Sequence, residues 1–412
     1  MSKADAVRIA EHLDQLSKVG ADVEGGFSRL AYTPPEREAH ALFREWLDGY
    51  GLETSTDAVG NSFGNLHGNE ELPALMSGSH LDSVYHGGNF DGAVGVVAAV
   101  EMARVLAEGK ALRHPLRVVA FAGEEGARFG APCIGSRLMT GAFTEETLRQ
   151  LKDRDGVSAW EAAKGVGLSP EHAESARWNR SEVECFVEIH IEQGRVLEAR
   201  ARRLGIVHTI GGSTRVELTF EGRADHSGAT PMWLRRDALV AAAEFVQAVE
   251  RRAQRHATTV ATVGSLQVHP GSLTTVPGQV LLGLDVRDID SERQRELTEA
   301  LLDDALRIAS GRELTVTARQ LSDQSPVVLH GTMQNVLSEA ATRLGLSFIG
   351  MASGASHDAA HIAMEIPTGM VFIPCREGVS HAPEEYADPS HISQAVDVVV
   401  DAFRAIDGGL TV

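Results

Sequence analysis

The sequence predicts an α/β protein made of two domains, one of which is discontinuous. Over the first half of the chain, short apolar runs alternate with amphipathic segments, an order typical of a largely parallel sheet covered by helices. The segment 209–325 instead reads strand, helix, strand, strand, helix, strand, and the earlier pattern resumes at Pro326. We therefore expect a first domain formed by 1–208 and 326–412 around a mostly parallel central sheet. Residues 209–325 are expected to form an inserted βαββαβ, ferredoxin-like domain.

Composition narrows the class of protein. The 412 residues, 43% of them hydrophobic, are enough for two separate cores. The formal charge of −19 disfavours nucleic acid and anionic membrane surfaces as partners. Cys133, Cys185 and Cys375 form no CxxC pair, so we expect neither a disulfide framework nor a thiolate zinc finger and place the protein in the reducing cytoplasm. No stretch approaches the ~20 apolar residues that span a bilayer.

The first part of the chain carries a regular series of predicted elements. Leu116 to Ala122 is apolar almost throughout, as in a strand that is covered on both faces. In order, we expect helices 4–18 and 35–49, strands 52–56, 60–66 and 72–77, the last running on to His80, helix 92–106, strand 116–122, short helices and loops over 134–180, and strand 183–191.

The inserted domain and the return to the first domain follow in order. We expect strand 215–222, helix 235–253, strands 258–269 and 276–288, helix 291–309 and strand 313–321 in the insert. After Pro326 we expect helices 328–344 and 357–364, strand 367–373 and helix 392–408.

Five side chains with nitrogen or oxygen donors fall at predicted strand ends in glycine-rich surroundings. They are His80, Asp91, Glu125, His190 and His381. Imidazole and carboxylate are the usual non-thiolate ligands of zinc and other first-row divalent ions. Five ligands are one too many for a single catalytic zinc with an open position. We therefore expect two ions that share a bridging carboxylate.

The adjacent pair Glu124 and Glu125 suggests a division of labour. One carboxylate can bind metal, and Glu124 can act as general base on a metal-bound water. Asp82, two residues after His80, is placed to accept the second imidazole N–H of His80.

The ordinary alternative is that a histidine lies on the surface or is simply hydrogen-bonded, and that a Glu-Glu pair is a solvated loop. We keep this interpretation for five other histidines, namely His86, His208, His269, His357 and His361. For the five candidate ligands it is weakened by their shared position at strand ends.

Six motifs, in the same order along the chain, give a resemblance to a known family. They are GSHLDSVYHGGNFDGAVG, FAGEEGARFG, EIHIEQGRVLE, DHSGATPM followed by Arg236-Asp237, SGASHDA, and IPCREGVSHAPEE. They resemble the N-carbamoyl-L-amino acid hydrolase, allantoate amidohydrolase and β-ureidopropionase group of the dinuclear aminoacylase and carboxypeptidase type metallohydrolases. The resemblance extends from about residue 30 to residue 400.

The resemblance implies a role for each donor. His80 and His190 would hold one ion and Glu125 and His381 the other, with Asp91 as the bridge. By the same resemblance, Glu124 is the general base and Asp82 supports His80.

The inserted domain is implied to be a lid that mediates homodimerisation. His226 matches a lid histidine that reaches an active site across the dimer and hydrogen-bonds the substrate carbonyl oxygen. Arg287 matches an arginine that pairs with the substrate carboxylate. Gln193 lies three residues after a candidate ligand, so it reaches the substrate or, equally, caps a helix.

Two departures from the allantoate amidohydrolase pattern concern the substrate. Ser213 stands where those enzymes have a substrate-contacting glutamine, and Thr274 stands where they have an asparagine. Both side chains are shorter, which permits a larger or differently shaped substrate. Ser356 lies in a loop that the family uses to contact substrate.

We therefore expect a hydrolase of a C–N bond in a linear ureido compound that carries a carboxylate, releasing ammonia and carbon dioxide. N-carbamoyl-L-amino acids, allantoate and β-ureidopropionate are the candidates. An N-acyl amino acid amidohydrolase or dipeptidase with the same metal site is the first alternative. A non-catalytic metal-dependent binding protein is the second, and Glu124 argues against it because binding alone needs no base. Two zinc ions per subunit are expected, with manganese, cobalt and nickel left open.

Overall fold

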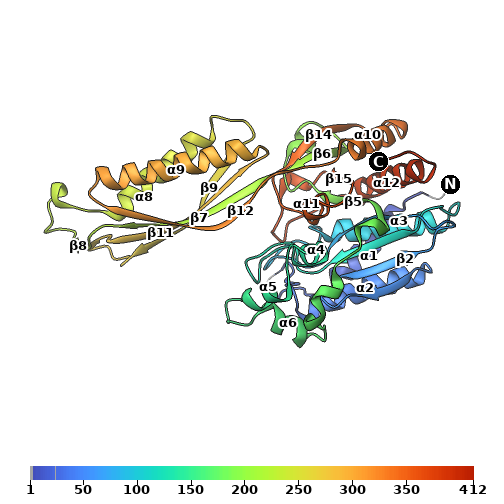
Figure 1. The fold of residues 1–412 in the computed structure, drawn as a ribbon. Helices are drawn as coiled ribbons and strands as arrows, with labels where there is room; N and C mark the ends of the chain where they lie inside the picture. The colour runs from blue at the N-terminus through green and yellow to red at the C-terminus, as the bar shows by residue number, and fades with distance from the viewer. Residues whose placement is uncertain (1–2, 24) are drawn as a thin grey trace. The chain divides into compact units, whose positions relative to one another are not determined.

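A computed structural model describes residues 3–23 and 25–412. The chain divides into two compact units (Figure 1). The first unit comprises Met1–His208 and Val328–Val412, and the second unit is Thr209–Val327. Each unit has its own hydrophobic core.

The first unit is built on one mixed sheet with the order β1-β2-β4-β3-β5-β15-β6-β13, with β14 paired to β6. Its four central strands are mutually parallel: β4 (Leu116–Phe121), β3 (Ala74–His80), β5 (Val183–Ile191) and β15 (Thr368–Ile373). The flanking strands β1 (Glu53–Thr56) and β2 (Ser62–Leu66) run antiparallel to their neighbours, and β6 (Leu204–Ile210) runs antiparallel to β15. The predicted parallel sheet is therefore found in the centre of this unit, where the strands are buried almost throughout.

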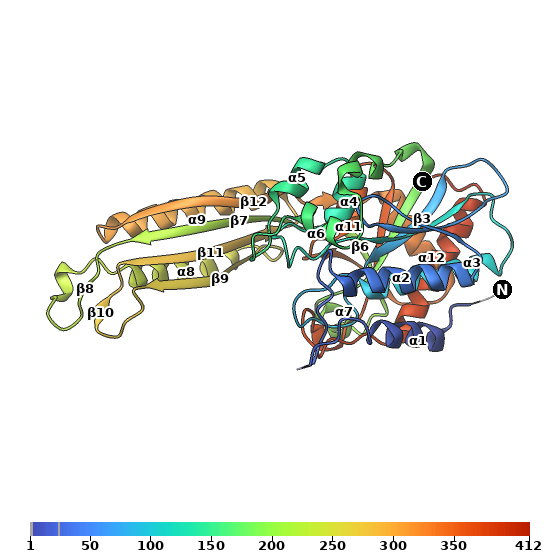
Figure 2. The same cartoon turned by 90° about the horizontal axis from the view of Figure 1, so that it is seen from below.

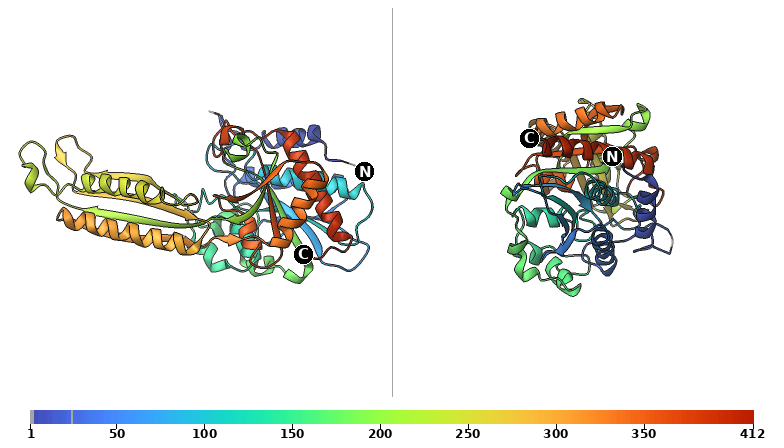
Figure 3. Two further views of the ribbon diagram at one scale, coloured as in Figure 1. Left: turned by 90° about the horizontal axis from the view of Figure 1, so that it is seen from above. Right: turned by 90° about the vertical axis from the view of Figure 1, so that its right-hand side faces the viewer.

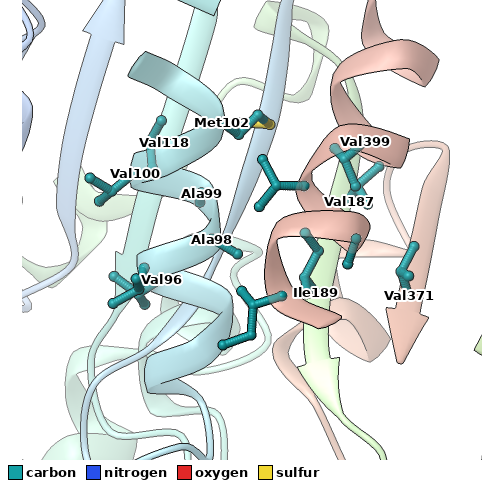
Figure 4. Close-up of a cluster of buried hydrophobic side chains, with 14 of the residues drawn as sticks. Val96, Ala98, Ala99, Val100, Met102, Val118, Val187, Ile189, Val371 and Val399 are labelled. Carbon is teal, nitrogen blue, oxygen red and sulfur yellow. The ribbon is translucent and has the colours of Figure 1, made fainter. Parts of the chain in front are cut away.

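Helix α3 (Ala93–Ala107) forms the middle of the first core. Its residues are apolar nearly all round the helix and buried from Ala93 to Leu106, as expected for a helix enclosed between a sheet and other helices. In Figure 4, Val96, Ala98 and Ala99 belong to a cluster that also contains Val187 and Ile189 of β5 and Val399 of α12 (Pro389–Asp407). This packing fixes the strand ends relative to the start of α3.

The remaining helices of the first unit are α1 (Ala6–Leu16), α2 (Pro34–Gly49), α4 (Ile134–Met139), α5 (Glu145–Gln150), α6 (Ala159–Gly165), α7 (Val196–Ala199), α10 (Gly331–Arg343) and α11 (Asp358–Ile362), with 3₁₀ turns η1 (Pro170–Ala176), η2 (Arg180–Glu182) and η4 (Arg376–Gly378). Helices α10 and α12, orange and red in Figure 3, lie side by side and both pack on β15.

Three strands of the first sheet were not predicted, namely β6, β13 and β14. β6 runs across the predicted domain boundary at residue 208, where no strand was predicted. β14 (Phe348–Ser353) is short and is interrupted by Gly350, which weakens its strand pattern, and it pairs with β6. The helix predicted from 328 begins only at Gly331, because β13 (Val327–Val328) joins the sheet.

The second unit has the element order strand, helix, strand, strand, helix, strand. Its long elements are β7 (Gly212–Glu221), α8 (Ala238–Ala253), β9 (Val260–His269), β11 (Gln279–Asp288), α9 (Ser291–Gly311) and β12 (Thr315–Gln324). The four strands form an antiparallel sheet in the order β12-β7-β11-β9. Burial alternates along β7 and β11, and their buried residues pack with those of α8 and α9, so the two helices cover one face.

Beyond the paired ends of β7 and β11 the second unit carries a small ribbon. β8 (Asp225–His226) pairs with β10 (Thr275–Val276), and the 3₁₀ turn η3 (Met232–Leu234) follows β8. Figure 2 shows β8 and β10 together at one end of the sheet.

Among the described residues, no helix combines the length and the apolarity needed to cross a membrane. Cys133, Cys185 and Cys375 are free and buried.

Candidate metal centre

The five predicted donor side chains lie together in the first unit. His80 is the last residue of β3, and Asp91 follows in the loop that leads into α3. Glu125 follows β4, His190 lies near the end of β5, and His381 lies in the loop after β15. Because the four strands are parallel, their carboxyl ends meet at one edge of the sheet, where α/β folds bind their ligands.

The donors form two clusters that share Asp91. In the first, Asp91 Oδ1 lies 3.1 Å from His190 Nε2 and 3.6 Å from His80 Nε2. In the second, Asp91 Oδ2 lies 3.2 Å from His381 Nε2, which is 3.4 Å from Glu125 Oε2. Within each cluster the three donor atoms lie within 4.8 Å of one another. Each oxygen of Asp91 therefore faces a different cluster.

The clusters fit divalent cations. Ligand atoms about 2.1 Å from a tetrahedral ion are separated by roughly 3.4 Å, which is close to the distances seen here. Glu125 Oε1 is buried and has no hydrogen-bond partner among the described residues. Burial raises the pKa of Glu125 well above its usual value, and Asp91 adds to this effect. A cation would remove the cost of these closely spaced buried carboxylates.

The two strand histidines present the same ring nitrogen to the cluster. His190 Nδ1 lies 2.9 Å from the carbonyl oxygen of Ile191, and His80 Nδ1 lies 3.2 Å from that of Asp82. An Nδ1–H that donates to a carbonyl leaves the Nε2 lone pair facing the cluster, where that of His190 accepts the backbone N–H of Gly92 at 3.3 Å. Gly92, which has a φ of +63°, permits the close approach of the His80 ring, because a Cβ at this position would lie 2.3 Å from His80 Cε1.

The Asp82 carboxylate makes two more contacts in the centre than the sequence predicted. Its Oδ1 lies 3.4 Å from His80 Nδ1, the contact expected from the sequence. In addition, Oδ1 accepts the backbone N–H of Glu124 at 2.8 Å and Oδ2 accepts that of Glu125 at 3.0 Å. One carboxylate thus connects the loop after β3 to the loop after β4.

Glu124 lies beside the first cluster without joining it. Its Oε2 is 3.7 Å from His80 Nε2, and its Oε1 accepts a hydrogen bond from the Cys133 thiol at 3.2 Å. Burial raises the pKa of Glu124 to about 8, although the nearby His80 imidazole lowers it. A buried carboxylate next to a cation site has the position expected of a general base.

Gln193 and Ser356 also lie near the centre. Gln193 Nε2 donates to Asp91 Oδ2 at 2.6 Å, so this side chain reaches the donor clusters. The alternative of a helix cap is wrong, because Glu192 accepts the first N–H groups of α7 instead. Ser356 Oγ is 4.0 Å from Cys133 Sγ, on the side of Glu124.

The four predicted residues of the second unit fall into two pairs. Arg287 lies opposite Ser213 in the β7–β11 ladder, and its guanidinium donates to Asp285 Oδ2 at 2.9 and 3.1 Å. His226 lies in β8, and the carbonyl of Thr274 accepts the N–H of Ser227 beside it. The two pairs lie at opposite ends of the β7–β11 ladder and do not meet within this unit.

The sequence did not identify three further residues that touch the centre. His357 was assigned as an ordinary histidine, but its ring packs edge-on against His190 with centroids 4.5 Å apart. Glu188 accepts hydrogen bonds from Ser79 Oγ and the N–H of Ala359. Glu385 binds the loop of Asp91. All three lie within the quoted motifs, so the motifs marked their segments but not their contacts.

Two clusters of imidazole and carboxylate donors, the first of them buried, with a further carboxylate beside them, define the site of a metal-dependent hydrolase. The chain belongs to peptidase family M20/M25/M40, whose model matches residues 76–405. The family predicted from the motifs is thereby confirmed, and with it the prediction of a metal-dependent hydrolytic enzyme.

Named relatives cover nearly the whole chain. The N-carbamoyl-L-amino acid amidohydrolase of Geobacillus stearothermophilus is 40% identical over 394 residues, covering 95% of this chain and 96% of that protein. The allantoate amidohydrolase of Escherichia coli is 35% identical over 391 residues, covering 94% and 95%. A crystal structure of an amidase of the hydantoinase/carbamoylase family from Burkholderia multivorans superposes with a TM-score of 0.90 at 35% identity, covering 98% of each chain.

Proposed function

We propose that this enzyme hydrolyses the C–N bond of a linear ureido compound that carries a carboxylate, in the manner of an N-carbamoyl-L-amino acid amidohydrolase. The observation that carries the proposal is the pair of donor clusters joined by Asp91, with Glu124 beside them. Relatives named for carbamoyl amino acids and for allantoate support the substrate class. The products are the amino acid, ammonia and carbon dioxide.

We assign the donors to two divalent ions, zinc in the first instance, since their ligands are imidazole and carboxylate. His80 and His190 would hold one ion, Glu125 and His381 would hold the other, and Asp91 would contribute one oxygen to each. When bound, the ions polarise the scissile carbonyl and make the attacking water more acidic.

Glu124 removes a proton from the attacking water and returns it to the leaving nitrogen. Its carboxylate is kept in place by the thiol of Cys133 and by the backbone bond from its own N–H to Asp82. Burial excludes bulk water from this carboxylate, so the proton stays within the site.

His226 is assigned to the substrate carbonyl oxygen. Its Nδ1 accepts the backbone N–H groups of Gly228 and Ala229 at 3.0 and 3.2 Å, so the proton lies on Nε2. The exposed Nε2–H is then a donor that can stabilise an oxyanion. Arg287 is assigned to the substrate carboxylate, beside the short side chain of Ser213.

The second unit is proposed to be a ferredoxin-like lid through which a homodimer forms. The sheet order β12-β7-β11-β9 is that of a βαββαβ unit whose first and third strands are central. Arg287 pairs with Ser213, whereas His226 lies beyond Glu221 at the other end of β7. Eight residues of antiparallel strand span roughly 27 Å, several times the length of a ureido acid. If both side chains act on one substrate, they must come from two copies of the chain.

The proposed base is tested by Glu124→Gln, with Glu38→Gln as a matched control on the surface of α2. We expect Glu124→Gln to lower kcat by about 10²–10⁴-fold with its metal content unchanged, and Glu38→Gln to have wild-type activity. An unchanged rate in Glu124→Gln would refute this mechanism.

The substrate class is tested by ammonia release from N-carbamoyl-L-amino acids, allantoate and β-ureidopropionate, beside N-acetyl amino acids and dipeptides assayed for free amine. Turnover confined to ureido compounds supports the proposal. Turnover of only acyl compounds or peptides would reassign the substrate and attribute the change to Ser213 and Thr274.

The shared site is tested by mixing His226→Ala and Glu124→Gln, each inactive alone. In a hybrid dimer one site receives an intact Glu124 and the intact His226 of the other copy. Random exchange should restore about a quarter of the wild-type sites. No recovery after exchange would contradict the assignment of His226.

We place the enzyme in the cytoplasm, since its three cysteines are free.

A further inference from the structure

Glu385 is a buried carboxylate that the proposed mechanism does not use. Its side chain is 4% exposed and lies in the loop that also carries His381. Glu385 Oε1 accepts the backbone N–H groups of Phe90 and Asp91, both at 2.8 Å. Its Oε2 accepts the Ser380 hydroxyl at 3.0 Å and the backbone N–H of His381 at 3.3 Å. One carboxylate therefore joins two loops that lie almost 300 residues apart in the sequence.

Gly88 shows that the first of these loops is shaped around this carboxylate. A Cβ at Gly88 would lie 2.3 Å from Glu385 Oε1 and 2.4 Å from Glu385 Cβ. The φ of Gly88 is not in the left-handed region, so glycine is not needed here for an unusual backbone conformation. The missing side chain instead lets the Glu385 side chain lie against the backbone of Gly88. Any larger residue would push the Glu385 carboxyl away from the N–H of Asp91.

The two donor clusters depend on these loops to different degrees. His80 and His190 belong to central strands and are each 1% exposed, so the core holds them in place. Asp91 and His381 come from loops, and His381 has a left-handed φ of 58° and a side chain that is 49% exposed. Left-handed backbone in a residue other than glycine persists only where its surroundings hold it. The backbone N–H of His381 donates its hydrogen bond to the Glu385 carboxylate, which therefore helps to hold this conformation.

We propose that Glu385 is a positioning residue that sets the affinity of the cation bound by Asp91, Glu125 and His381. It does so by holding the backbone of Asp91 and His381 at a fixed separation, without touching the cation or the substrate. The cation bound by His80, Asp91 and His190 depends on it less, because two of its three ligands are fixed by the sheet. This inference rests on the two-ion site proposed above.

The test is zinc binding to the purified full-length protein at a series of buffered free zinc concentrations. The variants are Glu385→Gln and Gly88→Ala, and Glu384→Gln is the matched control, since Glu384 is the exposed neighbour. Glutamine can keep one oxygen toward Phe90 and Asp91, but it then turns an NH₂ group toward the N–H of His381. Gly88→Ala displaces the same carboxyl without changing its charge.

We expect wild type and Glu384→Gln to bind two zinc ions. In Glu385→Gln and Gly88→Ala the affinity for the ion bound by Asp91, Glu125 and His381 should fall about 10- to 100-fold. The affinity for the second ion should stay within threefold of the wild-type value. At low zinc kcat should fall with KM unchanged, and saturating zinc should restore it, which a general loss of structure would not allow.

Two results would overturn the inference while leaving the two-ion site intact. One is two ions bound by Glu385→Gln and Gly88→Ala with wild-type affinities. The other is an equal fall for both ions, which would make Glu385 a general structural residue. If wild type itself binds fewer than two ions, the proposed two-ion function fails, and the inference fails with it.

Discussion

Asp82→Asn is expected to lower kcat by about 10- to 150-fold without unfolding the protein. Asn has the same shape as Asp, but its amide offers one acceptor oxygen where the carboxylate offers two. In the native chain those two oxygens accept the backbone N–H groups of Glu124 and Glu125 at 2.8 and 3.0 Å. One of these N–H groups would then face an NH₂ group and lose its partner.

The magnitude follows from that single lost bond. A hydrogen bond to a charged acceptor contributes about 1.5–3 kcal/mol. If this energy is lost from the positioning of the general base and of a neighbouring ligand, each 1.36 kcal/mol lowers the rate tenfold. The loss of charge beside His80 Nδ1 also weakens cation binding in the same direction.

The assay is steady-state turnover together with zinc content and the thermal unfolding midpoint. Asp14→Asn is the control, because it makes the same chemical change on an exposed side chain that forms an ion pair with Lys18. Wild-type kcat and zinc content in a folded Asp82→Asn would show that the two backbone bonds do not position the base.

Three further outcomes are expected. The hydrogen bond to Asp91 is the main cause that raises the pKa of His381 to about 9 in the metal-free chain, so below this pH a cation must displace a proton. Zinc affinity should therefore weaken about tenfold per pH unit as the pH falls from 8 to 7, measured by competition with a chelator of known pH dependence, and a flat profile would contradict this. Ile189→Ala, which truncates a side chain 1% exposed in β5, should cost about 2–5 kcal/mol in urea unfolding, whereas Val7→Ala, at 67% exposure, should stay within about 0.5 kcal/mol. Removing the ions by chelation should lower the unfolding free energy by about 2.7 kcal/mol for each ion relative to protein held at 100 times Kd, and an unchanged thermal midpoint would argue against cation binding by the folded state.

Local patterns explain how much of the fold the sequence predicted. The long elements were found because their periodicity is strong, as in the apolar run of β4 and the amphipathic α12. The strands β6, β13 and β14 were missed, because the last two are short and become strands by pairing with β6, which itself crosses the predicted domain boundary. The mixed character of the sheet is likewise set by which strands become neighbours, and no single segment encodes that order.

The sequence alone determined the chemistry of the donors, their order along the chain and the family. His80, Asp91, Glu125, His190 and His381 could be chosen because each follows a strand signal, and parallel strands end at a common edge. Only the tertiary structure decided which oxygen of Asp91 faces which cluster. It also assigned Glu385 to the loop of Asp91. These contacts join segments up to 295 positions apart, and packing of the core sets their distances to a fraction of an ångström, which residue spacing cannot do.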